Sequence, residues 1–215
     1  DIIKLSGSLQ AFNFYNNTIS SLTGDGSILR LSSLTENKYF EFNNNTIHNN
    51  NGPLILKASG TEISSISISF NNILDNKFST TLFTIDMILH NDNIIFFENL
   101  FQNNTLAIDD DQDDVKTVKS FIEVSSKVSN KNAQFIFEKC SFVRNIYKNI
   151  KRLNQHSQLN AMINLLLANS SLILKDTEFQ DTTMMNPGSD LFYIAAESVT
   201  VTNCTFHSTK TDNGR

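Results

Sequence analysis

Two acidic side chains, Asp86 and Glu123, are the pair in this sequence whose type and spacing come nearest to catalytic chemistry. Each lies on the polar side of a short apolar stretch, and parallel strands would place them diagonally across from each other. Inverting glycosidases use two carboxyl groups about 6.5–9.5 Å apart, one to protonate the leaving group and one to activate water. Ordinary solvent exposure explains the same pair, so we assign no catalytic residue.

A run of aspartates is the second candidate, because carboxylates are ligands that Ca²⁺ prefers. The run has neither the glycine turn nor the closing glutamate of an EF-hand loop, although two or three of its carboxylates would suffice to gather a cation. A solvated acidic loop is the preferred interpretation, and no metal site is assigned. The weak candidate ligands are Asp109, Asp110, Asp111, Asp113 and Asp114.

Composition excludes several classes of protein. The net charge of −5 argues against a nucleic-acid-binding protein, which would need a basic stripe. No apolar run reaches the roughly 18–20 residues of a membrane span. The four histidines share no metal-ligand spacing and no glycine-rich phosphate loop occurs, so we expect no cofactor.

A single motif recurs seven times and defines the elements that carry these side chains. Its first copy is Phe12-x-Phe14-x-x-Asn17-x-Ile19, and later copies follow after 28, 26, 28, 41, 37 and 27 residues. The alternation of apolar residues is typical of a strand with one buried face. A second apolar stretch in each coil predicts another strand, with the outward residues Arg30, Lys57, Thr84, Asp86, Glu123, Asn164 and Tyr193.

The repeat predicts an all-β fold, a parallel β-helix solenoid of about seven coils. A coil of about 27 residues is long enough for three short strands and three corners. Stacked coils would lie about 4.8 Å apart and would hydrogen-bond in parallel, so that each coil depends on its neighbours.

A column of asparagines at the bend after the first strand predicts an internal ladder. An Asn there can adopt the left-handed conformation and donate its amide to the Asn one coil away. The ladder consists of Asn17, Asn45, Asn71 and Asn99, which Cys140, Thr177 and Cys204 continue with small side chains. A second column, five residues later, contains Asn50, Asn76, Asn104 and Asn145.

This pattern resembles the right-handed parallel β-helix superfamily of pectate-lyase-like folds, and in particular the Asn-rich β-helix repeats of large surface proteins in ciliates and other protists. Phe101-x-x-Asn104 and Phe142-x-x-Asn145 also resemble the FxxN repeat of chlamydial outer-membrane proteins, whose companion Gly-Gly repeat is missing. The resemblance covers nearly the whole chain, and it implies a right-handed coil and an extracellular or cell-surface location. The paired-Asp, Gly-His-Gly and Arg-x-Lys motifs of polygalacturonase-like enzymes do not occur.

Two loop insertions, at about 105–120 and 146–160, interrupt the regular spacing and leave adjacent coils at the same corner. The first contains the aspartate run, and the second contains Lys148, Lys151, Arg152 and His156. Two solvated loops, mutual docking of opposite charges, and a ligand or partner site all remain open.

The two cysteines fall in the same column two coils apart. That separation exceeds the Cα distance of about 7 Å that a disulfide allows, so both are expected to be unpaired, buried thiols. Five Asn-x-Ser/Thr sequons are candidates for glycosylation, and those beside the ladder should face outward. The sequon asparagines are Asn16, Asn44, Asn103, Asn169 and Asn203.

We expect one β-helix domain over residues 1–215, a segment of a longer solenoid continued by more coils. The leading hypothesis is a non-catalytic structural or adhesive segment of a larger extracellular or surface-associated protein. Its partners would be other protein chains, further coils of the same chain, or glycans. The rival hypothesis is a polysaccharide-active or carbohydrate-binding β-helix, which should show convergent carboxylates or basic residues in a cleft.

Overall fold

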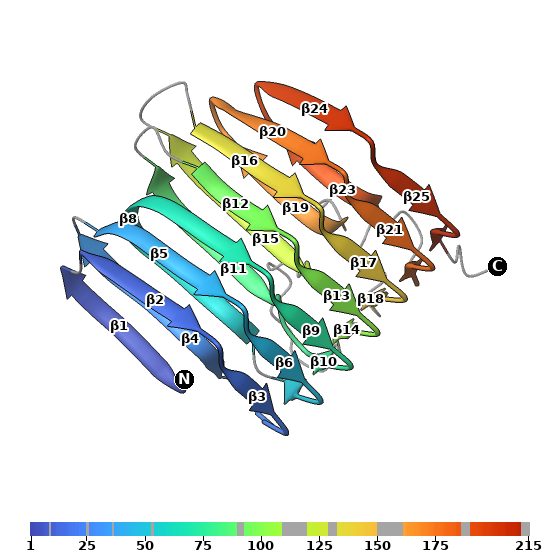
Figure 1. Cartoon of the computed structure of the whole chain (residues 1–215), viewed down its shortest axis with the longest axis horizontal. Coiled ribbons are helices and arrows are strands. Elements are labelled where there is room, and N and C mark those ends of the chain that lie inside the picture. Colours follow the sequence, from blue (N-terminus) through green and yellow to red (C-terminus); the bar gives the residue numbers. More distant parts are fainter. Residues whose placement is uncertain are drawn as a thin grey trace.

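The computed structural model of the chain describes residues 1–8, 10–24, 26–35, 37–52, 54–89, 93–108, 120–128, 133–149, 161–185 and 190–211. Within these ranges the chain forms strands and corners and no helix. Seven coils lie side by side, from the blue N-terminal coil to the red C-terminal coil in Figure 1. The predicted all-β parallel solenoid of seven coils is confirmed.

The strands of each coil belong to four parallel sheets, which we name A to D. Sheet A contains β1 (Ile3–Ser8), β4 (Ser27–Thr35), the first part of β8 (Leu54–Ser69), β11 (Phe83–Leu89), β15 (Ile122–Val128), β19 (Ala161–Leu167) and β23 (Asp190–Ala195). Sheet B contains β2 (Ala11–Tyr15), β5 (Asn37–Asn43), the second part of β8, β12 (Asn93–Phe97), β16 (Ala133–Glu138), β20 (Ser170–Lys175) and β24 (Ser198–Thr202).

The two smaller sheets consist of the shorter strands. Sheet C contains β3 (Thr18–Ser20), β6 (Thr46–His48), β9 (Asn72–Leu74), β13 (Leu100–Gln102), β17 (Ser141–Val143), β21 (Glu178–Gln180) and β25 (Thr205–His207). Sheet D contains β7 (Asn51–Gly52), β10 (Lys77–Phe78), β14 (Thr105–Ile108), β18 (Ile146–Asn149), β22 (Thr183–Met184) and β26 (Lys210–Thr211).

Six of the seven coils therefore contribute to all four sheets, where three strands per coil were predicted, whereas the described part of the first coil contributes only β1, β2 and β3. Strands of sheet D have two to four residues, and β10 carries a single buried apolar side chain, Phe78. So short an element shows no alternation, which is why the sequence gives no sign of it. The two predicted insertions begin with β14 and β18, which pair with each other in sheet D. Residues 109–119 and 150–160, with the aspartate run, lie outside the described residues.

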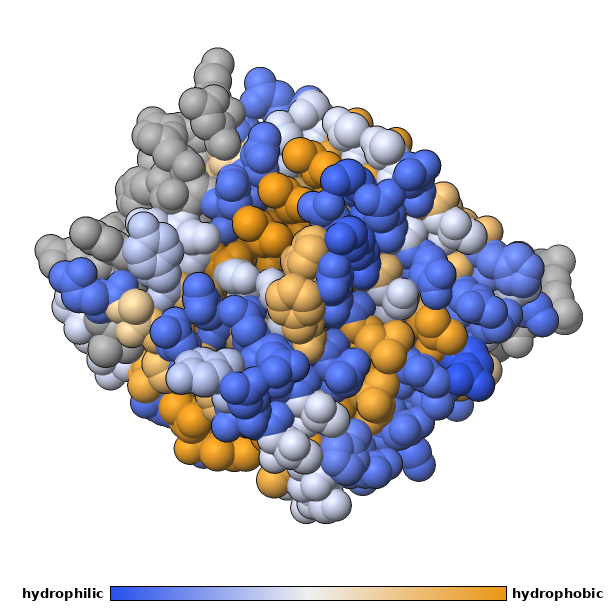
Figure 2. Space-filling view, in the orientation of Figure 1, coloured by the Kyte–Doolittle hydropathy of each residue, from blue (hydrophilic) through white to orange (hydrophobic). Residues whose placement is uncertain are grey.

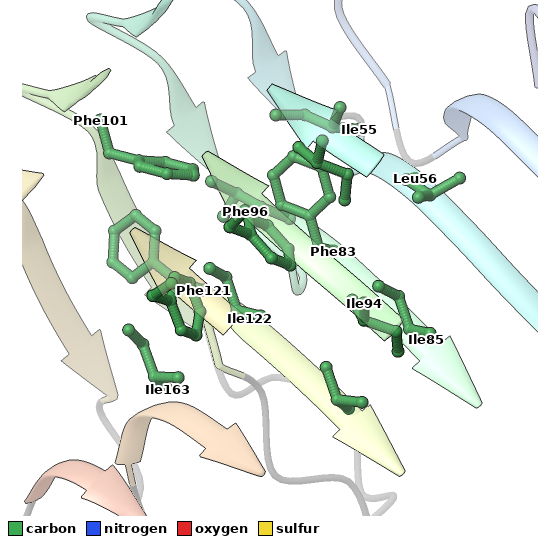
Figure 3. Close-up of a cluster of buried hydrophobic side chains, with 14 of the residues drawn as sticks. Ile55, Leu56, Phe83, Ile85, Ile94, Phe96, Phe101, Phe121, Ile122 and Ile163 are labelled. Atoms are coloured by element: carbon green, nitrogen blue, oxygen red, sulfur yellow. The ribbon is translucent and has the colours of Figure 1, made fainter. Parts of the chain in front are cut away.

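The interior is a stack of apolar columns. Phe101, Phe142, Phe179 and Phe206 stack in consecutive coils with ring centroids 4.5, 4.7 and 5.3 Å apart. Phe83 of sheet A meets this region edge-on, 6.2 Å from the Phe101 ring (Figure 3). Because parallel strands keep corresponding residues in register, apolar side chains fill each column from coil to coil.

The predicted asparagine ladder is present. Asn17, Asn45 and Asn71 each donate their amide Nδ2 to the Oδ1 of the ladder asparagine in the next coil, at 3.0, 3.0 and 2.9 Å. The same Oδ1 atoms accept the backbone N–H of the preceding ladder residue at 2.9–3.0 Å. Asn99 Nδ2 then lies 3.9 Å from the Sγ of Cys140. Each buried amide is thereby satisfied, which a buried polar group requires.

The second asparagine column forms a ladder of the same design. Nδ2 of Asn50, Asn76 and Asn104 donates to the next coil's Oδ1 at 2.9, 2.9 and 3.2 Å, ending at Asn145. Thr182 takes the following position, and its hydroxyl lies 3.4 Å from the carbonyl oxygen of Phe142.

The left-handed conformation occurs one residue earlier than predicted. The residue before each ladder position has a positive φ, for example 55° at Asn44 and 57° at Phe70, whereas the ladder asparagines do not. The preceding residue turns the chain, and this frees the ladder residue to point its amide into the stack. In the first two coils both positions are asparagine, so residue type alone could not separate them.

Candidate functional site

The outward face of sheet A carries the residues singled out for chemistry. Register places Thr84, Glu123, Asn164 and Tyr193 in one row across β11, β15, β19 and β23. Asp86 pairs with Ser125, two residues beyond Glu123, so Asp86 and Glu123 are diagonal neighbours as predicted. Diagonal side chains on a sheet are about 7–8 Å apart, which brings the two carboxyl groups within electrostatic reach.

Glu123 is the perturbed acid of this face. Burial, and to a smaller extent the negative charge of Asp86, raise the pKa of the Glu123 carboxyl above its ordinary value of 4.5. Burial disfavours the charged form because water no longer solvates it. A carboxyl group of this kind is suited to hold a proton, either to donate a hydrogen bond or to act as a general acid.

Asn164, beside Glu123 on the next coil, is a buried polar group that sequence reasoning did not single out. It is 7% exposed although it lies on the outward side of β19, and no described residue forms a hydrogen bond with its Oδ1. Sequence placed Asn164 on the outward face, but its burial could not be read from the alternation of residues.

A shallow hollow adjoins this row. It has a volume of about 610 Å³, and its lining includes Ser125, Leu166, Ala195, Asn169 and Glu197. Ser125, Leu166 and Ala195 are aligned by register and form the outward row of sheet A next to the row of Glu123. This second row is the floor of the hollow. The floor is largely apolar and the rim polar, a combination that accommodates a small amphipathic group.

Sheet B presents a different outward surface. Ile95, Ile136 and Ile173 form an aligned, half-buried row, and hydrophobic side chains gather among hydrophilic ones on the face seen in Figure 2. Phe97 packs edge-on against Phe70 with ring centroids 5.3 Å apart, and Phe70 is 48% exposed. The row is bordered by the ion pair between Lys175 and Glu138, at 2.7 Å.

The other candidate groups are not brought together. No cluster of three or more His, Cys, Asp or Glu residues that could hold a metal occurs in the described ranges. His48 lies next to Asn49, 3.0 Å from its Nδ2, and His207 is exposed in β25. His90, His156 and the aspartates from Asp109 to Asp114 lie outside the described residues.

The cysteines are unpaired as predicted. Burial raises the pKa of the Cys140 thiol to about 11, although hydrogen bonds with Asn99 and the Glu138 backbone lower it. Cys204 was expected to be buried too, but it is only half-buried, because no described coil lies on the far side of the last one.

All five sequon asparagines are exposed and have a positive φ. The angles are 58°, 55°, 54°, 57° and 54° at Asn16, Asn44, Asn103, Asn169 and Asn203. Four of them directly precede a ladder position, so these sequons follow from the repeat of corner Asn, ladder residue and strand Thr. Asn103 donates its Nδ2 to Asp75 Oδ1 at 2.9 Å.

Comparison with known proteins adds little to this description. No family model matches the sequence, and no curated protein matches it. Among solved structures, one of QnrB1, a plasmid-mediated fluoroquinolone resistance protein, covers 94% of both chains at 11% identity with a TM-score of 0.18. A trypsin-treated variant of QnrB1 is similar at 14% identity, again with a TM-score of 0.18, and covers 94% of this chain and 92% of that one.

Proposed function

We propose that the chain is a non-catalytic structural or adhesive segment of a larger extracellular or surface-associated protein. The observation that carries the proposal is the continuity of the interior. Two polar ladders and a phenylalanine stack run from coil to coil through the described part of the chain. A repeat whose residues serve coil-to-coil contacts is suited to extend a rod or to present a long lateral surface.

An extracellular or cell-surface location is part of this proposal. The exposed sequon corners support it, because a glycan attached at any of them would extend into solvent. Secretion of the chain from a eukaryotic host, followed by glycopeptide mapping, tests the point. Unmodified asparagine at all five sequons would count against a glycoprotein.

We assign the coil to the right-handed, pectate-lyase-like type on the strength of the repeat, since parallel crossovers are right-handed in nearly all folds. An experimental structure decides the handedness. A left-handed coil would remove the resemblance on which the family assignment rests.

The scaffold role is tested by incubating the purified chain with a panel of acidic and neutral polysaccharides. We expect no increase in reducing ends and no unsaturated products. Turnover that disappears in the Glu123→Gln variant would overturn the proposal.

A carbohydrate-active β-helix is the second candidate, and the raised pKa of the Glu123 carboxyl diagonal to Asp86 favours it. In that case Glu123 would act as general acid and Asp86 as general base across an inverting site. Turnover should then be lost in both Glu123→Gln and Asp86→Asn, and it should be retained in Lys57→Gln, which lies two coils from Glu123 on the same row.

A further inference from the structure

The outward face of sheet A exposes a large apolar side chain in the interior of the stack. Leu166 of β19 is 40% exposed, although coils lie on both sides of it. With its register partners Ser125 and Ala195 it forms the floor of the hollow of about 610 Å³. This face is lateral, so coils stacked at either end of the chain would leave it uncovered. A hollow of this size with an apolar floor accommodates the apolar part of a small ligand.

Polar acceptors converge at the Ser125 end of this floor. Asp86 of β11 lies directly across from Ser125, and Glu123 lies two residues before Ser125 on β15. Neighbouring strands are about 4.8 Å apart, and alternate residues of one strand are about 6.6 Å apart. The three side chains therefore form a triangle, and one polar group above its centre can contact all of them.

A fourth acceptor lies beside this triangle. Asn164 of β19 pairs with Glu123 on the same outward side of the sheet. It is 7% exposed, and no described residue forms a hydrogen bond with its Oδ1. The terminal torsion of an amide side chain is soft, so a small rotation turns this Oδ1 toward a donor above Glu123 and Ser125. Such a donor would remove the free-energy cost of a buried acceptor without a partner.

The charges around the hollow are mainly negative. Asp86 and Glu123 lie at one end and Glu197 lines the other, while no Lys or Arg is among the described residues that line it. Lys127, two residues after Ser125 on β15, sets one cationic residue against these three acids. Burial raises the pKa of the Glu123 carboxyl because water solvates its charged form poorly. A cation close to that carboxylate would take over the role of water.

We infer that this hollow binds a small primary amine, whose ammonium group lies over the triangle of Asp86, Glu123 and Ser125. Its apolar chain or ring lies along the floor on Leu166 and Ala195, which spans two strand spacings or about 10 Å from Ser125. An ammonium group has three N–H donors and no acceptor, which suits a site made of acceptors. A neutral alcohol brings one donor and no charge, and a carboxylate brings no donor, so both should bind more weakly.

A titration with three ligands of equal chain length tests the class of ligand. n-Hexylamine, n-hexanol and hexanoate are added separately to the isotope-labelled chain, and the backbone amide shifts are followed by NMR. Hexylamine should give saturable shifts at Ser125, Leu166 and Ala195. The dissociation constant of hexanol should be at least about tenfold higher, and hexanoate should give no saturable shift. Equal dissociation constants for hexylamine and hexanol, or no saturation with hexylamine, would overturn the inference.

Substitutions locate the two ends of the ligand. Glu123→Gln should raise the dissociation constant of hexylamine about tenfold, and Asp86→Asn about threefold, because that carboxylate is exposed. Leu166→Asn should weaken hexylamine more than propylamine, since the longer chain covers more of the floor. Glu41→Gln is the matched control, because Glu41 is exposed on β5 of sheet B, and it should change nothing. Equal effects of Glu41→Gln and Glu123→Gln would show general attraction of cations and would contradict a defined site.

This inference goes beyond the scaffold role, and the two fail separately. A chain that binds no amine can still extend a stack of coils, and turnover of a polysaccharide would leave the amine titration unchanged.

Discussion

At the scale of single residues, one ladder asparagine satisfies four hydrogen-bonding groups at once. Asn71 donates its Nδ2 to Asn99 Oδ1 and Phe42 O, at 2.9 and 2.7 Å, and its Oδ1 accepts two donors from Asn45. Its side chain therefore links three coils. Removal of such a group leaves several buried partners without hydrogen bonds, which costs more than the bonds themselves contribute.

Asn71→Ala should lower the free energy of unfolding by about 3 kcal/mol, since each buried orphaned group costs about 1–3 kcal/mol. Urea unfolding followed by circular dichroism measures the change. Asn72→Ala is the control, because Asn72 is exposed on β9, and its effect should stay within about 0.5 kcal/mol. Equal effects of the two variants would show that the ladder does not contribute to stability.

Glu123→Gln should stabilise the chain at neutral pH and not in acid. Burial and the Asp86 charge raise the pKa of Glu123 in the folded state above the ordinary 4.5, so the folded chain binds this proton more tightly. The contribution of Glu123 to the stability of the unmodified chain therefore falls as pH rises from 4.5 through the raised pKa, with a slope of at most about 1.4 kcal/mol per pH unit.

Urea unfolding of both chains across this pH range provides the measurement. The advantage of the variant should grow with pH and then level off above the raised pKa. Asp86→Asn, which removes the like charge and so lowers the folded-state pKa of Glu123, should move this levelling-off to lower pH. An advantage that does not change with pH would indicate a packing effect.

Much of the residue-scale picture could be predicted, because asparagine type and spacing together determine the ladder. The position of the left-handed residue could not be predicted from residue type. In the middle coils the left-handed conformation is adopted by residues that rarely favour it or differ widely in chemistry, namely Phe70, Glu98, Lys139 and Asp176. The candidate site could be predicted in part. Register placed Asp86 diagonal to Glu123, but the burial of Asn164 depends on three-dimensional context that no periodicity encodes.

At the scale of the element, strand length decides what the sequence reveals. β16 alternates buried and less buried residues over six positions and is evident from its pattern, whereas β10 has two residues and is not. The three-residue strands of sheet C were found because they follow the ladder residue at a fixed distance. An element is therefore readable when it is long or when a neighbouring motif marks it.

The phenylalanine stack gives a prediction at this scale. Phe142→Ala should destabilise the chain by about 3–5 kcal/mol, because the ring is fully buried between Phe101 and Phe179. Phe206→Ala should cost much less, roughly 1 kcal/mol, because that ring is half exposed. Thermal and urea unfolding measure the stability of both variants. Similar losses of stability would show that burial within the phenylalanine stack is not the main way in which Phe142 stabilises the chain.

At the scale of the whole molecule, the strands of each coil pair only with strands of adjacent coils throughout the described ranges, so stability should vary along the stack. In such a one-dimensional array a local defect propagates through nearest-neighbour interfaces and weakens with distance. End coils, covered on one side, open at a lower free energy than central ones.

Hydrogen exchange by mass spectrometry should resolve this gradient. Amides of β12 and β13, in the fourth coil, should exchange most slowly, and those of β2 and β24 should exchange fastest in dilute chains. Asn71→Ala should accelerate exchange in the second to fourth coils more than in β21 or β25, because its lost bonds join those three coils. Asn72→Ala is the control and should leave the gradient of exchange rates unchanged. If Asn71→Ala accelerated exchange equally in all seven coils, the coils would unfold as one unit.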